Sequence, residues 1–424
     1  MKIFARVLIV VGLATVAWWF PHRMVHSSQT AYAATPAPAL VAASVNTVPG
    51  MPPVLDSRNL YSETAPGKVS PALKGDLVRV YVPNLRSNDV SVIDPETLKV
   101  VDRFKVGESP QHIVPAWDLR TLWVANNAER RQSGSLTPID PRTGKPGQAV
   151  PVDDPYNLYF TPDGKSAIVV AEARHRLDFR DPKTMAMQYA IEVPQCGGIN
   201  HADFSIDGRY AIFTCEFDGS IAKIDLVHRS VMGYLKLKMP KTRFKDVPSL
   251  DGPVASEICT SRKGMPQDVR VSPNGKRFFV ADMEADGVHV IDGDAFQEVG
   301  FIPTGVATHG LYPSRDGKSL YAANRGSHKI HGPKHGKGSV SVIDFATEKV
   351  VAQWPVPGGG SPDMGNISAD GRWLWLSGRF DDVVYRIDTT NGQMREIKVG
   401  MEPHGLTVWP LPGRYSLGHT GNLR

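Results

Sequence analysis

The stretch VRVYVPNLRSNDVSVIDPETLKVVDRFKVG, residues 78–107, decides the fold. Its three runs of β-branched and aromatic residues are separated by polar turns, which is the pattern of short antiparallel strands. A second copy, SLYAANRGSHKIHGPKHGKGSVSVIDFATEKVVAQWPV, occupies residues 319–356 and differs mainly in a longer first connection. A phrase that tolerates insertions in its connections and not in its strands is typical of a repeat protein.

An aspartate at the end of one strand in each copy counts the repeats. Its side chain can accept hydrogen bonds from the backbone of the tight turn that follows, as in DPET. A second marker, an SPDG-like turn, recurs five times from residue 161 to residue 371, and its glycine supplies the positive φ of a hairpin turn. The seven marker aspartates are Asp94, Asp140, Asp181, Asp225, Asp292, Asp344 and Asp388.

Seven markers predict an all-β fold, a seven-bladed β-propeller whose blades each have four antiparallel strands, named a to d from the axis outward. The chain enters the repeat at strand b, within residues 78–107, and leaves it with a strand a at 405–409. We therefore expect the N- and C-terminal strands to close the last blade together, which leaves no free sheet edge.

The N-terminal region has the features of an export signal. Residues 1–33 combine basic residues, the 14-residue apolar stretch 7–20 and the small-residue sequence AYA at 31–33. We expect cleavage after Ala33, because the apolar stretch is shorter than the roughly 20 residues that cross a bilayer; an uncleaved anchor is the alternative. Residues 34–76 are then an Ala/Pro-rich linker, residues 77–424 the propeller, and the location periplasmic or secreted, without a membrane span after cleavage.

Charge and cysteine content exclude two classes of function. The formal charge of +5 falls to about +2 when three basic residues leave with the signal, so the sequence does not indicate nucleic-acid binding. No CxxCH motif occurs, which excludes covalent c-type haem on this chain. No GxSxG, Walker or HExxH motif occurs either. We expect a monomer whose macromolecular partner would be a periplasmic protein or a redox partner.

Three cysteines, Cys196, Cys215 and Cys259, allow one disulfide and one thiol, or three unpaired thiols. Cys196 precedes strand a of blade three, Cys215 ends strand b of the same blade, and Cys259 lies in the long connection before blade four, so all three fall at one face of the predicted ring. We expect a disulfide from Cys259 to one of the other two, which would fix the long insertion 238–265 to the rim; metal ligation by cysteine is the alternative.

The starts of the innermost strands are the predicted site, because strand a lines the axial channel of a propeller. Counting back from each SPDG-like turn places four histidines and two aspartates at equivalent positions around one mouth. Imidazole is a common ligand of zinc, copper and iron, so we predict a binding site there for a transition metal (Cu, Zn or Fe) or a haem-like cofactor. The alternative is a structural role, with hydrogen bonds to neighbouring blades or to channel water. The seven positions hold His112, Asn157, His201, Asp268, His309, Asp363 and His404.

Two further groups lie on the same predicted face. Arg325 and Arg379 follow strand b of their blades and suit carboxylate or propionate recognition, or could bridge blades. The insertion 326–339 carries three histidines in a Gly- and Lys-rich loop, which could capture a metal ion or be a solvated loop. These histidines are His328, His331 and His335.

The phrase VYVPN…SNDVSVIDPETLKVVDRFKVGESPQHI closely resembles the YVTN-type propeller repeat of exported bacterial proteins, over roughly residues 78–410. The segment INHADFSIDGRYAIFTCEFDGSIAKID, residues 199–225, resembles a blade of cytochrome d1-type haem domains and related propellers of d1 haem biosynthesis. This resemblance implies that His201 is a haem or substrate contact. Lactonase-type propellers are another related group, which place acidic residues and Asn in the funnel where this chain has histidine.

Three functions follow from these observations. The first is a redox or cofactor-handling propeller that binds a haem-like molecule or a transition metal at the histidine-lined mouth. The second is a protein-binding scaffold without chemistry, which would use the insertions 238–265 and 326–339. The third is a lactonase-like hydrolase that depends on Asp268 or Glu216.

Overall fold

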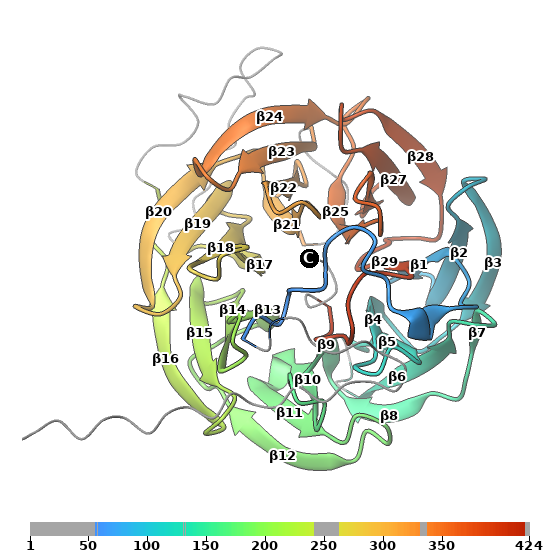
Figure 1. The fold of residues 1–424 in the computed structure, drawn as a ribbon, viewed down its shortest axis with the longest axis horizontal. Coiled ribbons are helices and arrows are strands. Elements are labelled where there is room, and N and C mark those ends of the chain that lie inside the picture. The colour runs from blue at the N-terminus through green and yellow to red at the C-terminus, as the bar shows by residue number, and fades with distance from the viewer. Residues whose placement is uncertain are drawn as a thin grey trace, which may run out of the picture. The chain divides into compact units, whose positions relative to one another are not determined.

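The computed structural model describes residues 56, 58–129, 131, 133–240, 263–330 and 337–419, all within one compact unit that spans Ala42–Arg424. These residues form seven antiparallel sheets arranged as the blades of a ring, so the predicted seven-bladed β-propeller is confirmed (Figure 1). Two 3-10 helices, η1 (Pro71–Leu73) and η2 (Glu172–Arg174), are the only helices in this part of the chain, and neither has the length or hydrophobicity of a transmembrane helix.

The strands of blades 1 to 3 follow the chain from the axis outward, and blade 1 carries a fifth strand that pairs with its third. Blade 1 comprises β4 (Pro110–Pro115), β5 (Leu122–Asn126), β6 (Ser133–Asp140), β7 (Lys145–Pro146) and β8 (Val150–Asp153). Blade 2 comprises β9 (Pro155–Phe160), β10 (Ala167–Ala171), β11 (Arg176–Arg180) and β12 (Met187–Glu192). Blade 3 comprises β13 (Ile199–Phe204), β14 (Tyr210–Cys215), β15 (Ser220–Asp225) and β16 (Ser230–Lys236).

Blades 4 to 6 repeat this order, and blade 7 combines both ends of the ring. Blade 4 comprises β17 (Pro266–Val271), β18 (Arg277–Asp282), β19 (Gly287–Asp292) and β20 (Gln297–Pro303). Blade 5 comprises β21 (Thr308–Pro313), β22 (Ser319–Asn324), β23 (Ser339–Asp344) and β24 (Lys349–Pro355). Blade 6 comprises β25 (Pro362–Ile367), β26 (Trp373–Gly378), β27 (Val383–Asp388) and β28 (Met394–Lys398). Blade 7 comprises β29 (Thr407–Trp409), β1 (Arg79–Asn84), β2 (Asp89–Asp94) and β3 (Lys99–Lys105).

Burial falls from the axis to the rim of each blade. The innermost strands β4, β9, β13, β17, β21 and β25 are buried at every residue, whereas outer strands such as β3 and β24 have no fully buried residue. The hydrophobic clusters lie between neighbouring blades, so each blade covers the apolar faces of the next one. Closing the ring through β29 and β1 therefore completes both a sheet and a core.

The two sequence markers have the predicted structural roles. Asp94 accepts hydrogen bonds from the backbone N–H groups of Glu96 and Thr97 at 3.0 and 2.9 Å, so it caps the turn between strands c and d. The glycines of the SPDG-like turns have positive φ; Gly164, for example, has φ 67°. These a–b turns share one face of the ring, here called the turn face; the opposite face, which carries the b–c and d–a connections, is called the funnel face.

Segments from both ends of the chain cover the channel at the turn face. The N-terminal segment 58–76, which lies in the predicted linker, packs on the propeller. Leu60 donates its backbone N–H to Ile206 O at 2.8 Å, and the Tyr61 hydroxyl donates to Asp203. In Figure 1 this blue segment crosses the middle of the ring. The C-terminal segment 410–419 runs beside it, since the Gly413 N–H donates to Lys68 O at 3.3 Å. The linker boundary at residue 76 stays a prediction.

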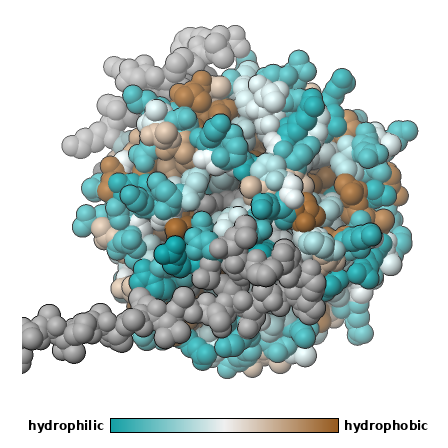
Figure 2. Space-filling view, viewed as in Figure 1, coloured by the Kyte–Doolittle hydropathy of each residue, from teal (hydrophilic) through white to brown (hydrophobic). Residues whose placement is uncertain are grey.

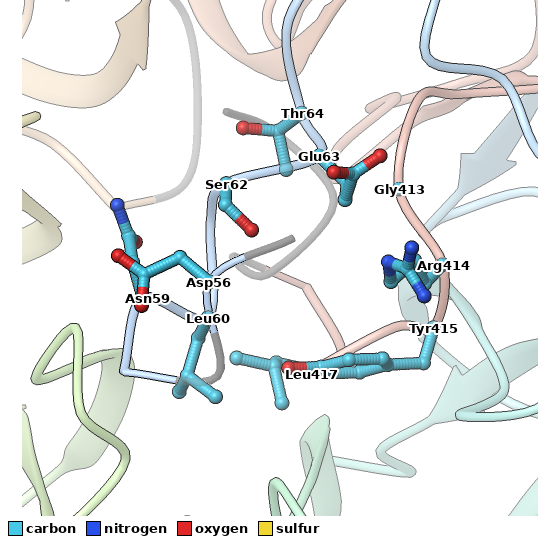
Figure 3. A pocket seen from close by; sticks show the side chains of 10 residues that line it. All are labelled: Asp56, Asn59, Leu60, Ser62, Glu63, Thr64, Gly413, Arg414, Tyr415 and Leu417. Atoms are coloured by element: carbon cyan, nitrogen blue, oxygen red, sulfur yellow. The ribbon is translucent and has the colours of Figure 1, made fainter. Parts of the chain in front are cut away.

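A small hollow of about 10 Å³ lies between these two segments, with Asn59 and Glu63 on one side and Arg414 and Tyr415 on the other (Figure 3). A space of this size is suited to about one water molecule. The same face is largely hydrophilic around the ring, with scattered hydrophobic side chains (Figure 2). The channel is therefore covered at the turn face. The predicted site residues at the starts of the innermost strands lie at the funnel face.

A buried ion network inside blade 4 gives a pH prediction. His289 Nδ1 lies 3.1 Å from Glu298 Oε1, and Nε2 lies 3.4 Å from Asp282 Oδ2. Burial lowers the pKa of His289, but the two carboxylates outweigh it and raise this pKa from 6.5 to about 9. Since the folded-state pKa is raised, the network stabilises the fold fully below pH 6.5 and loses this contribution as pH rises through about 9.

His289→Gln is expected to lower the free energy of unfolding by about 2–3 kcal/mol at pH 6, with a smaller difference from the wild type at pH 10. Urea denaturation at pH 6, 8 and 10 measures the difference. His228→Gln is the control, because the His228 side chain is 79% exposed. A deficit that stays constant from pH 6 to pH 10 would contradict the proposed charge on His289.

Candidate functional site

The seven predicted positions meet at the funnel-face end of the channel. Six lie in the first three residues of the innermost strands, and His404 lies just before β29. None is more than 3% exposed. Because buried polar groups are normally hydrogen-bonded, each of these side chains requires a hydrogen-bond, ionic or metal partner. These positions are His112, Asn157, His201, Asp268, His309, Asp363 and His404.

Small residues make room for the histidine rings. A Cβ atom added at Gly405 would lie 1.9 Å from His112 Nδ1, so only glycine lets the ring of blade 1 reach this place. At the equivalent Gly310, an added Cβ would lie 2.5 Å from the backbone oxygen of Asp363. In each His-Gly pair, the histidine contributes an imidazole to the site. The glycine leaves room for a group of a neighbouring blade, which is the His112 ring at Gly405 and the Asp363 backbone at Gly310.

One corner of the site is the Asp363 hub, defined as Asp363 with Arg325, Arg379, His309 and His404. Asp363 Oδ1 lies 2.9 Å from His309 Nδ1 and 3.1 Å from Arg325 Nε, while Oδ2 lies 3.5 Å from His404 Nε2 and 3.8 Å from an amino group of Arg379. Burial raises the pKa of Asp363, but the Arg325 charge and the histidines outweigh it and hold the pKa well below its usual value. The carboxylate is therefore ionised at neutral pH.

A second group adjoins the hub and is called the imidazole cluster, defined as His112, His201 and His419; the ring of His112 lies 4.8 Å from that of His404. The ring centroids lie 5.1 Å apart for His112 and His201, 4.4 Å for His112 and His419, and 5.2 Å for His201 and His419. Their Nε2 atoms are buried and have no hydrogen-bond partner within the described ranges. Asp268 completes a group with His201 and His419 in which one ligand atom of each lies within 4.8 Å of the others.

The imidazoles of this cluster are neutral. Burial lowers the pKa of His112 from 6.5 to about 3 and places the pKa of His201 and of His419 well below the usual value. A neutral imidazole offers one nitrogen lone pair, which is what a metal ligand requires. Buried nitrogen atoms without a partner and with available lone pairs fit a transition-metal ion.

Asp268 has contacts that serve the fold. Its Oδ1 lies 2.6 Å from an amino group of Arg270, which is itself fully buried, and its Oδ2 accepts the backbone N–H of Leu311 in blade 5 at 2.9 Å. Burial raises the pKa of Asp268 to about 6, against the effect of Arg270. Asp268 thus joins blades 4 and 5. It also lies beside the imidazole cluster, where its carboxylate is within reach of a shared ligand with His201 and His419.

Carboxyl and amide groups line the funnel above the imidazole cluster. Glu216 Oε2 accepts the side-chain N–H of Asn200 at 2.7 Å, and the ring of Tyr156 lies 5.3 Å from that of His112. Burial raises the pKa of Glu216 and, with the Glu216 charge, raises the pKa of Glu172 well above its usual value. This part of the funnel, on blades 2 and 3, therefore carries amide, phenol and carboxyl groups, while Arg325 and Arg379 lie in the Asp363 hub.

The loop histidines do not join this site in the described residues. His328 Nε2 lies 2.7 Å from Asp286 Oδ1, a contact between blades 5 and 4. His331 and His335 lie outside the described residues, so the predicted metal site in the loop stays a prediction. Arg325, by contrast, lies in the Asp363 hub, with an additional bond to Lys329 O at 3.2 Å.

The disulfide joins Cys196 to Cys215, with their Cα atoms 4.8 Å apart. The expected bridge to Cys259 is therefore wrong, since both possible partners are used; Cys259 itself lies outside the described residues. Both bonded cysteines are fully buried beside the paired strands β13 and β14, where Ile199 is opposite Cys215. Cys196 lies in the d–a connection before β13, and Cys215 lies at the end of strand b, β14. The spacing of the cysteines along the sequence did not reveal that these two places meet.

Cys215→Ser is expected to lower the free energy of unfolding by about 3 kcal/mol, because the bridge closes a short loop in the unfolded chain. Urea denaturation with and without a reductant measures it, and the reductant should lower wild-type stability without further effect on the variant. Cys259→Ser is the control. Equal loss of stability in the two variants would contradict the assigned pairing.

His419 was not among the predicted site residues. This residue belongs to no repeat, and its position depends on the C-terminal segment entering the channel from the turn face. Tyr415 stacks on Trp117 with ring centroids 5.5 Å apart, Leu417 O accepts the N–H of Phe160 at 3.1 Å, and the His419 N–H donates to Leu158 O at 3.1 Å. The segment thus follows β9 up the channel until the His419 ring reaches His112 and His201.

Comparisons with known proteins agree with the fold. A family model described as a YNCE-like beta-propeller matches residues 39–180. No curated protein matches the chain. The predicted resemblance to repeat-type propellers, with a partial likeness to cytochrome d1-type propellers, is confirmed by this family match and by the structural neighbours.

Three solved structures have similar folds at low sequence identity. Dihydro-heme d1 dehydrogenase NirN in complex with DHE has a TM-score of 0.55 and 14% identity, covering 78% of this chain and 75% of that one. Hydrazine synthase of Kuenenia stuttgartiensis has a TM-score of 0.53 and 18% identity, covering 70% and 88%. A putative 6-phosphogluconolactonase from Bacteroides uniformis has a TM-score of 0.59 and 16% identity, covering 78% and 99%. At these identities the likeness concerns the fold alone.

Proposed function

We propose that this chain is an exported β-propeller that binds a transition-metal ion at the imidazole cluster, in a redox or cofactor-handling role. The observation that carries the proposal is the set of three buried, neutral imidazoles, His112, His201 and His419, whose Nε2 atoms have no hydrogen-bond partner among the described residues. Burying such nitrogen atoms without a partner costs about 1–3 kcal/mol each, which metal coordination would offset.

The residues present suit copper, zinc or iron more than a hard cation. His201 and His419 would hold the ion together with a carboxylate oxygen of Asp268, since one ligand atom of each lies within 4.8 Å of the others. Asp268 would then exchange its contact with Arg270 for the ion, and the neutral ring of His112 lies beside the two histidines. A bound ion of this class supplies Lewis-acid or electron-transfer chemistry. The polypeptide provides a site covered at the turn face by the terminal segments, so a ligand would approach from the funnel face.

A haem-like ligand is the second candidate. Support comes from the fold likeness to NirN, whose structure contains DHE, and from the resemblance of residues 199–225 to d1-type blades. His201 would be the residue that contacts it. In this structure the rings of His112, His419 and Tyr156 pack around His201 with centroids 5.1 to 5.7 Å away, so a macrocycle would require these rings to move apart.

The deciding experiment is metal analysis and an absorption spectrum of the full chain purified from its native host. We expect about one equivalent of copper, zinc or iron and no haem bands; haem bands would select the second candidate instead. Colourless, metal-free protein that also fails to bind Cu²⁺, Zn²⁺ or Fe²⁺ on reconstitution would overturn both. His201→Ala is the matched variant, because its loss should abolish either mode of binding.

A lactonase-like reaction has one supporting observation, the fold likeness to a putative 6-phosphogluconolactonase. Glu216 is then the acid–base candidate, since it is buried and burial raises its pKa. This alternative predicts lactone turnover that is lost in Glu216→Ala and retained after metal removal.

A further inference from the structure

The Asp363 hub contains more positive charge than its one carboxylate can neutralise. Arg325 and Arg379 both approach Asp363, and the two histidines of the hub cannot offset them, because an imidazole carries no negative charge in its neutral or protonated form. At neutral pH the hub therefore has two guanidinium groups and one carboxylate. The imbalance is one positive charge at a buried position.

The excess charge belongs to Arg379. Arg325 is fully used: Nε and one amino group bond to Asp363 at 3.1 and 3.3 Å, and the other amino group donates to Lys329 O at 3.2 Å. Arg379 has one ion pair, at 3.8 Å, and its Nε has no hydrogen-bond partner in the described part of the chain. Its side chain is only 3% exposed, so water satisfies little of the guanidinium.

The Arg379 charge faces the interior of the funnel. It is felt by groups on other blades: after burial, it is the largest cause of the lowered pKa of His404, and it opposes the effect of burial on the pKa of Tyr156 and of Glu216. No described carboxylate other than Asp363 lies within the 4.0 Å ion-pair distance of this guanidinium. An anion in the funnel would complete both its charge balance and its hydrogen bonding.

We propose that Arg379 is the anchor of a binding site for a small oxyanion, a carboxylate or a phosphate group, at the funnel face beside the Asp363 hub. A guanidinium donates two parallel N–H bonds to two oxygens of such a group, and a single-atom anion such as chloride does not offer this pair of acceptors. Asn200 on blade 3 bonds to Glu216 through its side-chain N–H, and its Oδ1 has no hydrogen-bond partner among the described residues, so this oxygen can accept a bond from the remainder of the ligand. The site requires no metal and is independent of the function proposed above.

Isothermal titration of the EDTA-treated full chain with acetate and with inorganic phosphate tests this inference, at an ionic strength kept constant with sodium chloride. We expect saturable binding whose Kd rises at least tenfold in Arg379→Gln. Arg379→Lys should keep the charge and lose part of the affinity. Arg372→Gln is the matched control and should bind as the wild type does, since Arg372 belongs to the same blade, is 60% exposed and pairs with Asp388.

The two anions distinguish the source of the ligand. Tighter binding of acetate assigns a carboxylate ligand, and tighter binding of phosphate assigns a phosphorylated one. Loss of binding in a misfolded variant is recognised by denaturation: without anion and at low salt, Arg379→Gln should be at least as stable as the wild type, because it removes an uncompensated buried charge. Absence of saturable binding to either anion, or equal binding by Arg379→Gln, would overturn the proposal.

Discussion

Replacing Asp363 with alanine is expected to lower the free energy of unfolding by about 3–5 kcal/mol, the usual cost of removing one partner from a buried ion pair. Asp363 is fully buried and is the shared acceptor of Arg325, Arg379 and His309. Without it, two guanidinium groups would remain in the interior with no carboxylate between them. Urea denaturation of the metal-free protein measures the loss.

Two further variants make this result specific. Asp316→Asn should change stability by less than about 0.5 kcal/mol, because Asp316 is 56% exposed and the equivalent turn at 272–275 already has asparagine. Adding Arg379→Met to Asp363→Ala should restore part of the stability, since it removes one of the uncompensated charges. If the free energy of unfolding of Asp363→Ala were within about 1 kcal/mol of that of the wild type, Asp363 would not be the carboxylate that neutralises the buried arginines.

His419→Ala is expected to weaken metal binding by at least about 100-fold, because groups that merely orient a metal ligand already account for 10–100-fold. The residue supplies one of the three unpartnered Nε2 atoms of the imidazole cluster. Isothermal titration of the chelator-treated full chain with Zn²⁺ and Cu²⁺ measures the affinity. The bound ion should also raise the unfolding temperature of the wild type and leave that of the variant nearly unchanged.

The control is His228→Ala, whose side chain is exposed on the turn after β15. It should bind either metal as the wild type does, and thereby exclude surface imidazoles as the source of the signal. Affinity retained within about threefold in His419→Ala would remove the C-terminal segment from the site and return the cluster to a packing role.

The fold was predictable because short local motifs in the sequence mark the individual blades. The marker aspartates and the SPDG-like turns act within a few residues of their own position, so their spacing translates directly into strands and turns. Counting back from those turns also located the inner ring, and the structure does bring His112, His201, His309 and His404 to one end of the channel. Because the seven inner strands are equivalent, the register of each strand determines which residue lies at the mouth of the channel.

Contacts between non-repeated segments were not predictable in this way. His419 reaches the imidazole cluster through stacking of Tyr415 on Trp117, a contact across almost 300 residues. The pairing of Cys196 with Cys215 likewise depends on the meeting of two connections. The ion pairs of Asp268 and Asp363 with buried arginines could not be separated from ligand-binding roles by residue type alone.

Residues 407–419 supply both β29, which closes the ring, and His419, which completes the imidazole cluster. During synthesis these residues emerge after all six other blades. A chain interrupted before them would leave the edge of β1 unpaired and the cluster without one of its rings. Ligand capture would then report that residues 407–419 had been synthesised and had taken their place in the ring.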